Sequence, residues 1–204
     1  MLTIENNVLV KCDENATEVV IPEGVTEINW GAFKDCKLLT SIVIPESIKK
    51  IRGSAFSGCE SLKSIVIPKG VTEIGFSAFG DCQSLSSIVI PEGVNEIGYN
   101  AFAGCVSLKS IVIPKSLKDI NSSDLKDCTA LSNIKYDGTI AEWNILYSEL
   151  FHDGSSEITI ECSDGIAVPY SKQENFVSIV IPDSVNKISD FAFENCTPVE
   201  QNSS

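Results

Sequence analysis

Apolar and polar residues alternate along most of this chain in a pattern that recurs every 23 residues. The third copy reads Ser64-Ile65-Val66-Ile67-Pro68 and continues with Val71, Ile74, Ala78-Phe79 and Cys82. Five copies keep the same spacing of one proline and one cysteine: Pro22, Pro45, Pro68, Pro91 and Pro114, and Cys36, Cys59, Cys82, Cys105 and Cys128. A fixed period in this range predicts a solenoid in which each repeat forms one coil.

Within a copy, the short apolar run predicts a strand and the direction of its side chains. Successive strand residues face opposite sides, so Leu62, Ile65 and Ile67 are expected to point into the coil. Ser64, Val66 and Pro68 are expected to point out of it. The remaining apolar positions return inward and close the convex side of the coil: Val71, Ile74, Ala78, Phe79 and Cys82. A lone repeat cannot bury these groups, so neighbouring coils must cover them.

The two ends of the chain differ from the repeat. Leu2 to Glu5 and Val8 to Lys11 flank Asn6-Asn7, and asparagine tolerates the positive φ of a tight turn. We therefore expect residues 1–17 to form a hairpin that caps the first coil. Residues 18–199 are expected to form one solenoid of about eight coils, followed by a frayed tail at 200–204.

The pattern changes after Pro114. Asp124-Leu125 stands in the place of Ala-Phe, but the inward positions look apolar enough for the coil to continue. Thr139 and Glu142 have the spacing of a capping box, and Gly154 supplies a stop, which predicts an α-helix over about 139–150 inside an insertion at 138–156. Its apolar face is Ile140, Trp143, Tyr147 and Leu150. A last copy then runs from Ser178 to Cys196.

Charge and hydropathy exclude two classes of partner. Acidic residues outnumber basic ones 28 to 15, giving a net charge of −13, so a nucleic-acid phosphate backbone is a poor partner. No apolar run approaches the roughly 18 residues of a membrane helix, so membrane insertion is not expected.

The eight cysteines do not predict disulfides. Equivalent residues of adjacent coils lie about 5 Å apart with parallel side chains, whereas a disulfide needs side chains that face each other. We interpret the repeat cysteines, with Cys12 and Cys196 at the ends, as a buried ladder of small apolar groups. No Cys-x-x-Cys occurs and there is one histidine, so we expect neither a zinc site nor another metal or cofactor.

Catalytic constellations are lacking in the sequence. His152 and Cys162 can be imagined as a nucleophile pair, but no third orienting group or oxyanion motif accompanies them. Four aspartates near the changed region lack the spacing of a calcium loop: Asp124, Asp127, Asp153 and Asp164. We therefore expect no enzyme.

The motif Ile-Val-Ile-Pro, Val-x-x-Ile, Ala-Phe, x-x-Cys, x-x-Leu closely resembles the BspA-like leucine-rich repeat family over about residues 18–199. The resemblance implies a right-handed, curved leucine-rich repeat superhelix, a β-rich solenoid with short parallel strands on its concave face. Such proteins are typically surface or secreted proteins implicated in adhesion to host proteins, matrix or other cells. The family motif is scaffold throughout, so it carries over no catalytic residue.

The concave face is the first candidate binding surface, because a solenoid presents a broad sheet there. Its outward positions form a smooth Ser/Val surface with a more polar end: Ser41, Val43, Ser64, Val66, Ser87, Val89, Ser110 and Val112, then Asn133, Lys135, Glu157, Thr159, Ser178 and Val180. A flat apolar stripe suits a protein ligand. The alternative is that valine is simply a good β-former for an exposed strand.

A second ladder lies two residues after the inward isoleucine of each coil. It comprises Trp30, Gly53, Phe76, Tyr99, Ser122 and Asp190. Trp30, Phe76 and Tyr99 are a weaker candidate for binding, since aromatic residues often anchor partners. Alternatively, they shield the seam between coils or fill space beside glycine.

These observations predict a non-enzymatic protein-binding scaffold. The resemblance favours an adhesion module at the cell surface or secreted, with a host surface or matrix protein as partner. The N-terminus lacks the positive and apolar regions of a secretory signal, so a cytoplasmic structural or regulatory interaction module stays open as the alternative.

Overall fold

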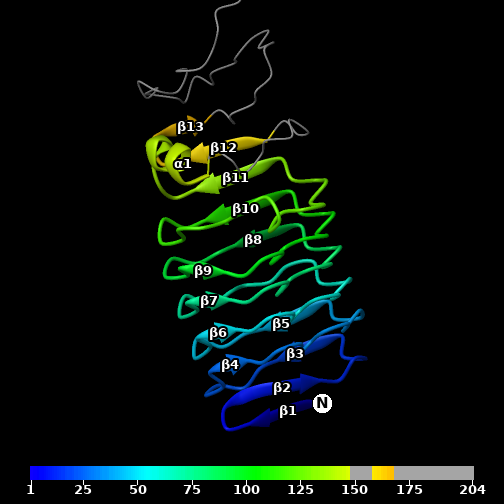
Figure 1. Cartoon of the computed structure of the whole chain (residues 1–204). Helices are drawn as coiled ribbons and strands as arrows, with labels where there is room; N and C mark the ends of the chain where they lie inside the picture. Colours follow the sequence, from blue (N-terminus) through cyan, green and yellow to red (C-terminus); the bar gives the residue numbers. More distant parts are fainter. Residues whose placement is uncertain (148–157, 168–204) are drawn as a thin grey trace, which may run out of the picture.

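The described part of the chain forms a β-solenoid of about six turns with a single helix, as the computed structural model in Figure 1 shows. The structure describes residues 1–147 and 158–167. Short strands stack in two rows along the solenoid, one on each side of the coils, and the single helix lies at the end remote from the N-terminus. The predicted solenoid with one inserted helix is therefore confirmed. The predicted last copy, residues 178–196, and the tail lie outside the described residues.

A hairpin covers the first coil, as the Asn6-Asn7 pair predicted. β1 (Leu2–Glu5) pairs antiparallel with β2 (Val8–Cys12). Asn6 and Asn7 have φ values of 49° and 63°, in the left-handed region that asparagine tolerates better than most residues. The backbone N–H of Thr26 donates to the carbonyl of Asn7 at 2.8 Å, which joins the cap to the first coil.

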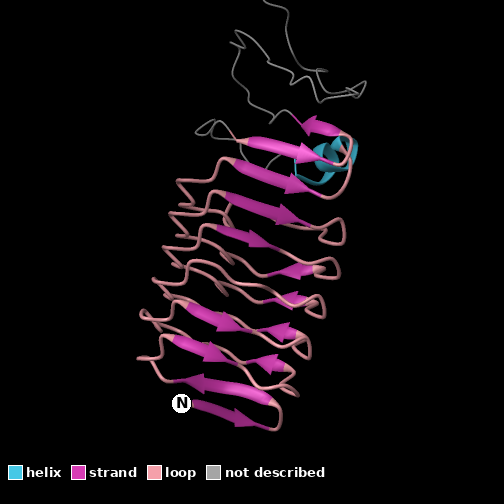
Figure 2. Cartoon of the chain, turned by 180° about the vertical axis from the view of Figure 1, so that it is seen from behind, coloured by secondary structure: helices cyan, strands magenta, loops and turns pink. Residues whose placement is uncertain are grey.

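The first row of strands contains the Ser-Ile-Val segments of the repeat. β3 (Glu18–Val20) pairs parallel with β5 (Ser41–Val43), and β8 (Ser87–Val89), β10 (Ser110–Ile113), β11 (Asn133–Tyr136) and β12 (Thr159–Cys162) form a second parallel run (Figure 2). β13 (Gly165–Ala167) closes that run antiparallel to β12. The row is interrupted at residues 64–67, which form no strand and pair with neither neighbour. The prediction of a strand in this third copy is wrong, although its side chains alternate as expected.

A second row of strands lies on the other side of the coils and was not predicted. β4 (Glu27–Ile28), β6 (Lys50–Ile51), β7 (Glu73–Ile74) and β9 (Glu96–Ile97) pair in parallel, each with the next coil. Each strand has only two residues, too few for alternation to be visible in the sequence. The inward isoleucine of each coil was recognised, but the strand that contains it was not.

The interior is a column of equivalent side chains. Leu62, Ile65, Ile67, Val71 and Ile74 are all buried, as the alternation predicted. The four repeat phenylalanines form a continuous stack with near-parallel rings, and adjacent ring centroids lie 4.9, 5.3 and 5.6 Å apart: Phe33, Phe56, Phe79 and Phe102. Each ring is covered by the coils above and below it, so the core belongs to the stack and not to any one repeat.

The cysteines form the predicted buried ladder of free thiols: Cys12, Cys36, Cys59, Cys82, Cys105 and Cys128. Their role is more specific than apolar filling. Each thiol from Cys59 onward donates to the phenylalanine carbonyl of the preceding coil, at 3.1 to 3.2 Å. Each of these carbonyls already accepts from the N–H of the cysteine in its own coil, so the thiol adds a second hydrogen bond that links adjacent coils.

One predicted orientation is wrong, and one inward position is not apolar as expected. Pro68 is buried instead of pointing outward, as are Pro45, Pro91 and Pro114. The carbonyl of Pro68 accepts from the N–H of Val71 at 3.1 Å, so the turn has begun at Pro68 and strand alternation no longer applies. Asp124 also faces inward, with 1% of its surface exposed, where the other coils have alanine.

The Asp124 carboxylate replaces part of the backbone ladder. Its Oδ2 accepts from the N–H of Asn121 at 3.0 Å. Burial raises the pKa of Asp124, while backbone N–H groups of Asn121, Asn100 and Ala101 oppose that increase. The coil therefore continues through hydrogen bonds of a buried carboxylate, and the expectation that every inward position stays apolar fails here.

The helix α1 (Ile140–Tyr147) begins where the capping box predicted. Glu142 Oε2 accepts from the N–H of Thr139 at 2.9 Å, and Thr139 Oγ1 accepts from the N–H of Glu142 at 3.2 Å. Ile140 and Trp143 are buried, and the Trp143 ring lies 5.6 Å from Tyr136. Tyr147 and Leu150, the rest of the predicted apolar face, have side chains outside the described part. Asp164, which the sequence analysis considered only as a calcium ligand, accepts from the N–H of Ile140 at 2.8 Å.

Candidate functional site

The first row of strands exposes the predicted serine and valine side chains, and we call this surface the Ser/Val face. Val43, Val66 and Val89 are exposed, and Val66 is the most open of them at 80%. Ser41, Ser64 and Ser87 are exposed, whereas Ser110 and Val112 are half-buried. Val20, which we did not include, extends the valine row by one coil and is 68% exposed. Four valines of successive coils thus face solvent in one line.

The polar end of the Ser/Val face has a different register from the one expected. Asn133 pairs with Thr159, and Lys135 pairs with Glu161. The side-chain amide of Asn133 donates to Glu161 Oε1 at 2.9 Å, so Glu161 belongs to this surface although the sequence did not indicate it. Glu157, Ser178 and Val180 lie outside the described residues.

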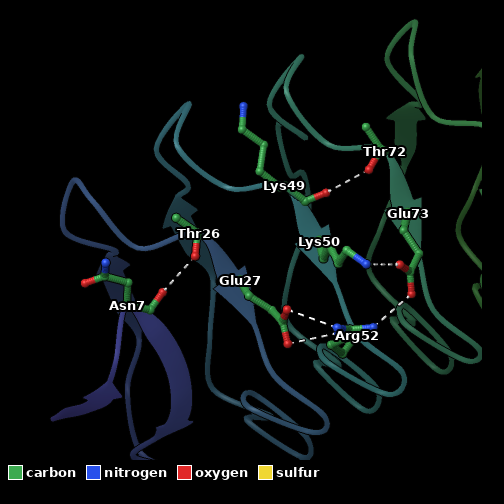
Figure 3. A network of polar contacts seen from close by, with 8 residues as sticks. All are labelled: Asn7, Thr26, Glu27, Lys49, Lys50, Arg52, Thr72 and Glu73. Atoms are coloured by element: carbon green, nitrogen blue, oxygen red, sulfur yellow. Dashed lines mark hydrogen bonds and ion pairs between the residues drawn. The ribbon is translucent and has the colours of Figure 1, made fainter.

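The second row of strands carries charged side chains, which Figure 3 shows at close range. The guanidinium of Arg52 lies between two acidic residues of the flanking coils. It donates to both carboxylate oxygens of Glu27, at 2.9 and 3.1 Å, and to Glu73 Oε1 at 3.2 Å. Lys50 Nζ lies 3.0 Å from the other oxygen of Glu73. The two acids and the two cations neutralise each other in this part of the row.

The predicted aromatic ladder lies beside this charged row. The rings of Trp30 and Phe76 lie 4.8 Å apart and close over Gly53, where an added Cβ would stand only 2.6 and 2.8 Å from them. These two residues therefore fill space beside glycine, as the alternative interpretation held, yet both keep about half of their surface exposed. Tyr99 is 73% exposed, Ser122 is also exposed, and Asp190 lies outside the described part. The structure brings the aromatic ladder and the acidic row onto one face.

A cleft of about 410 Å³ lies on this face, between the aromatic ladder and the strands. The aromatic side is formed by Trp30, Phe76 and Tyr99. Three glycines also line it, Gly53, Gly75 and Gly98. The polar part of the lining is Arg52, Glu73, Asn95, Glu96, Asp119 and Asn121. We call this feature the aromatic-acidic cleft.

The thiols are poor nucleophiles in this environment. Burial raises the pKa of Cys36 and Cys105 to about 12 and that of Cys128 to about 11, and it raises the pKa values of Cys59 and Cys82 further. A thiol reacts through its thiolate, so these groups have no nucleophilic role near neutral pH. Cys162 is half-buried on β12. His152, its imagined partner, lies outside the described residues.

Residues 1–147 and 158–167 contain no helix long and apolar enough to cross a membrane.

The repeat pattern matches a known family. Six copies of the "BspA type Leucine rich repeat region" match residues 2–132, 50–162 and 169–203, and the last range includes the predicted final copy. No curated protein matches the chain.

Several solved structures are similar. A leucine-rich cell surface protein from Faecalibacterium prausnitzii is 37% identical, with a TM-score of 0.67; the match covers 71% of this chain and 40% of that protein. A Treponema pallidum leucine-rich repeat protein is 25% identical, with a TM-score of 0.57, over 67% of this chain and 81% of that one. The pneumococcal vaccine antigen PcpA shares the fold. It is 20% identical, with a TM-score of 0.67, over 76% of this chain and 39% of that one. This chain therefore spans less than half of the first of these proteins.

Proposed function

Because the chain belongs to the BspA-type leucine-rich repeat family, we propose that it is a non-enzymatic scaffold that binds a protein through its Ser/Val face. The family's repeat supports an interaction scaffold, and its motif supplies packing residues in place of catalytic ones. The binding surface must then come from positions that face solvent.

The observation that carries the assignment is the row of exposed valines. Val20, Val43, Val66 and Val89 stand in line on successive coils, without a charged residue between them along the row. Burying such a stripe against a partner removes apolar area from water at about 25 cal/mol per Å². The adjacent serines supply hydroxyl groups that can form hydrogen bonds at the edges of the contact.

We further propose that the protein acts at the cell surface in adhesion, with a host surface or matrix protein as partner. The support is the 37% identical Faecalibacterium prausnitzii protein, which is described as a cell surface protein. The match covers only 40% of that protein, so the role of its remaining parts is not carried over to this chain.

The second candidate is an intracellular interaction module. The observation that favours it is the ladder of six buried free thiols, since unpaired cysteines are usual where the cell keeps thiols reduced. Fractionation of the native source separates the two, because a protein found only in the cytosol contradicts the adhesion proposal.

Replacing Val66 and Val89 together with lysine tests the Ser/Val face. Both side chains are exposed, so the double variant should fold normally but place two charges in the apolar stripe. We expect binding to a panel of purified host matrix and surface proteins to fall at least tenfold, measured by surface plasmon resonance. Val106→Lys is the matched control, because Val106 is exposed but lies on neither row of strands.

Unchanged binding by the Val66→Lys/Val89→Lys variant, with an unchanged circular dichroism spectrum, contradicts the proposal. An equal loss in Val106→Lys also contradicts it, because the effect would then reflect added charge and not the position of the charge.

A further inference from the structure

The aromatic-acidic cleft differs from the rest of its face in charge balance. Arg52 and Lys50 neutralise Glu27 and Glu73 in the first coils. Glu96 and Asp119 occupy equivalent positions in the next two coils, and among residues 1–147 and 158–167 no cation forms an ion pair with either of them. The cleft therefore opens toward the acidic, uncompensated part of the row.

The chain itself shows which group suits such a row of acids. Arg52 lies on the coil between Glu27 and Glu73 and makes three hydrogen bonds to them, two of which form a bidentate pair with Glu27 (Figure 3). A planar guanidinium matches carboxylates in this bidentate way, whereas an ammonium does not. The spacing of Glu27 and Glu73, which lie two coils apart, therefore fits a guanidinium between them.

Gly98 occupies the position equivalent to Arg52, two repeats later. Its coil lies between that of Glu73, whose carboxylate already pairs with Arg52 and Lys50, and that of Asp119. Glu96 lies on β9, which ends one residue before Gly98. A Cβ at Gly98 would collide with the backbone nitrogen of Phe76 and stand 2.6 Å from its Cα. The close backbone of the preceding coil thus excludes a side chain at position 98, and the chain has no arginine of its own there to pair with Glu96 and Asp119.

The aromatic side of the cleft adds a second reason for a cation. Phe76 and Tyr99 stand beside Gly98 along the ladder and are both exposed. A guanidinium stacked on such rings gains cation–π attraction of about 0.5 to 1 kcal/mol at an exposed site. The acidic residues and the aromatic residues that line the cleft thus both favour a guanidinium.

We propose that the aromatic-acidic cleft binds an arginine side chain of a partner polypeptide over Gly98, in the way that Arg52 binds Glu27 and Glu73. The net charge of −13 favours the approach of a basic segment. This proposal shares one element with the proposed function, namely that the chain binds a protein. It concerns the second row of strands, so it can hold or fail separately from the Ser/Val face.

The test is an NMR titration of the ¹⁵N-labelled chain with the capped peptide acetyl-Gly-Gly-Arg-Gly-Gly-amide. We expect saturable amide shifts confined to residues around the cleft: 73–76, 95–99 and 119–121. The same peptide with citrulline in place of arginine keeps the shape but removes the charge, and it should bind at least tenfold more weakly. The lysine peptide should also bind more weakly, because it lacks the fork of donors.

Matched variants locate the site. Glu96→Gln with Asp119→Asn should weaken binding of the arginine peptide at least tenfold, and Tyr99→Ala should weaken it about two- to fivefold. Glu92→Gln, at an exposed acid that does not line the cleft, should leave binding unchanged. The Val66→Lys/Val89→Lys variant should also bind the peptide normally, which separates this site from the Ser/Val face.

Three results overturn the proposal. Equal binding of the citrulline peptide or of the lysine peptide shows that the guanidinium is not recognised. Shifts spread over exposed acids throughout the solenoid show non-specific attraction. Full binding by the Glu96→Gln/Asp119→Asn variant, with its amide spectrum otherwise intact, shows that these carboxylates hold no ligand.

Discussion

The interior and the outside of this solenoid differ in how strictly they repeat. Inside, the same residue returns in each regular coil, as the stacked phenylalanines and the thiol ladder show. Outside, the second row of strands changes from coil to coil, from Glu27 through Lys50 and Glu73 to Glu96. The interior is constrained because neighbouring coils share it, whereas an outer position contacts solvent and is free to vary. The Ser/Val face is the exception on the outside, because serine and valine return there in successive coils. Repetition inside is therefore explained by shared packing, whereas repetition on the Ser/Val face is not required by the core.

The largest effect is expected from alkaline pH, because the buried thiols stay protonated in the folded chain and ionise in the unfolded chain. The pKa of Cys105 is raised to about 12 in the folded chain from an ordinary value of 9.0, and that of Cys82 is raised well above it. Above pH 9 the unfolded chain therefore loses thiol protons that the folded chain keeps. Stability is fully present below pH 9 and falls as pH rises toward 12, by about 1.4 kcal/mol per pH unit for each such thiol.

Urea unfolding under reducing conditions between pH 8 and 10.5 measures this slope. A variant with Cys82→Ala and Cys105→Ala should show a shallower decline, by about 1.4 kcal/mol per pH unit for each thiol removed. Ser64→Ala serves as the control, because Ser64 is exposed and carries no titrating group, so the slope should stay unchanged. An identical slope in the Cys82→Ala/Cys105→Ala variant contradicts the role assigned to the thiols.

Val66 and Ile67, which are adjacent in one repeat, test the difference between the outside and the interior. Ile67 is buried and Val66 is 80% exposed. Ile67→Asp places an unpaired charge in a core that adjacent coils share, so we expect a loss of at least about 4 kcal/mol and loosening of neighbouring coils as well. Val66→Asp should change stability by about 0.5 kcal/mol or less. Hydrogen exchange and urea unfolding measure both, and similar losses in the two variants refute the assignment of inside and outside.

Much of the fold could be predicted because it depends on repetition. The inward positions, the cap, the free thiols and the helix start at Thr139 each rest on local spacing that the sequence displays. The buried Pro68 and the buried Asp124 could not be predicted, because each depends on a turn or a lost backbone bond between coils. The gap at residues 64–67 has no signal in the sequence, which there matches the other copies, and nothing in the structure explains it.

The candidate surfaces were predictable to different degrees. The Ser/Val face follows directly from strand alternation, so most of its residues were identified. The aromatic-acidic cleft was only half identified, through Trp30, Phe76 and Tyr99. Its acidic side depends on two-residue strands and on the glycines beneath, which give no periodic signal. The sequence does show that Gly98 occupies the same repeat position as Arg52. That equivalence becomes informative only once the hydrogen bonds of Arg52 to Glu27 and Glu73 are known.

Gly98 gives the smallest expected effect on stability. It also shows that an outer position is not always free to vary. Positions equivalent to Gly98 vary, as Asn29, Arg52, Gly75 and Asn121 show, yet a Cβ at Gly98 would meet the backbone of Phe76 because the coils approach so closely. Gly98→Ala should therefore cost about 1 to 3 kcal/mol, because the backbones must move apart. Ser87→Ala, at an exposed position of the Ser/Val face, should cost about 0.5 kcal/mol or less. Equal stability of the two variants in thermal unfolding contradicts the close approach.

The most direct test of the account compares the two outer faces while a protein partner is bound. Hydroxyl-radical footprinting with mass spectrometry reads the exposure of Val43, Val66 and Val89 on one face and of Trp30 and Tyr99 on the other. With a host matrix protein that binds the wild-type chain, we predict strong protection of the three valines. Protection confined to other surfaces, with the valines oxidised as in the free chain, would contradict the assignment of the Ser/Val face as the binding surface.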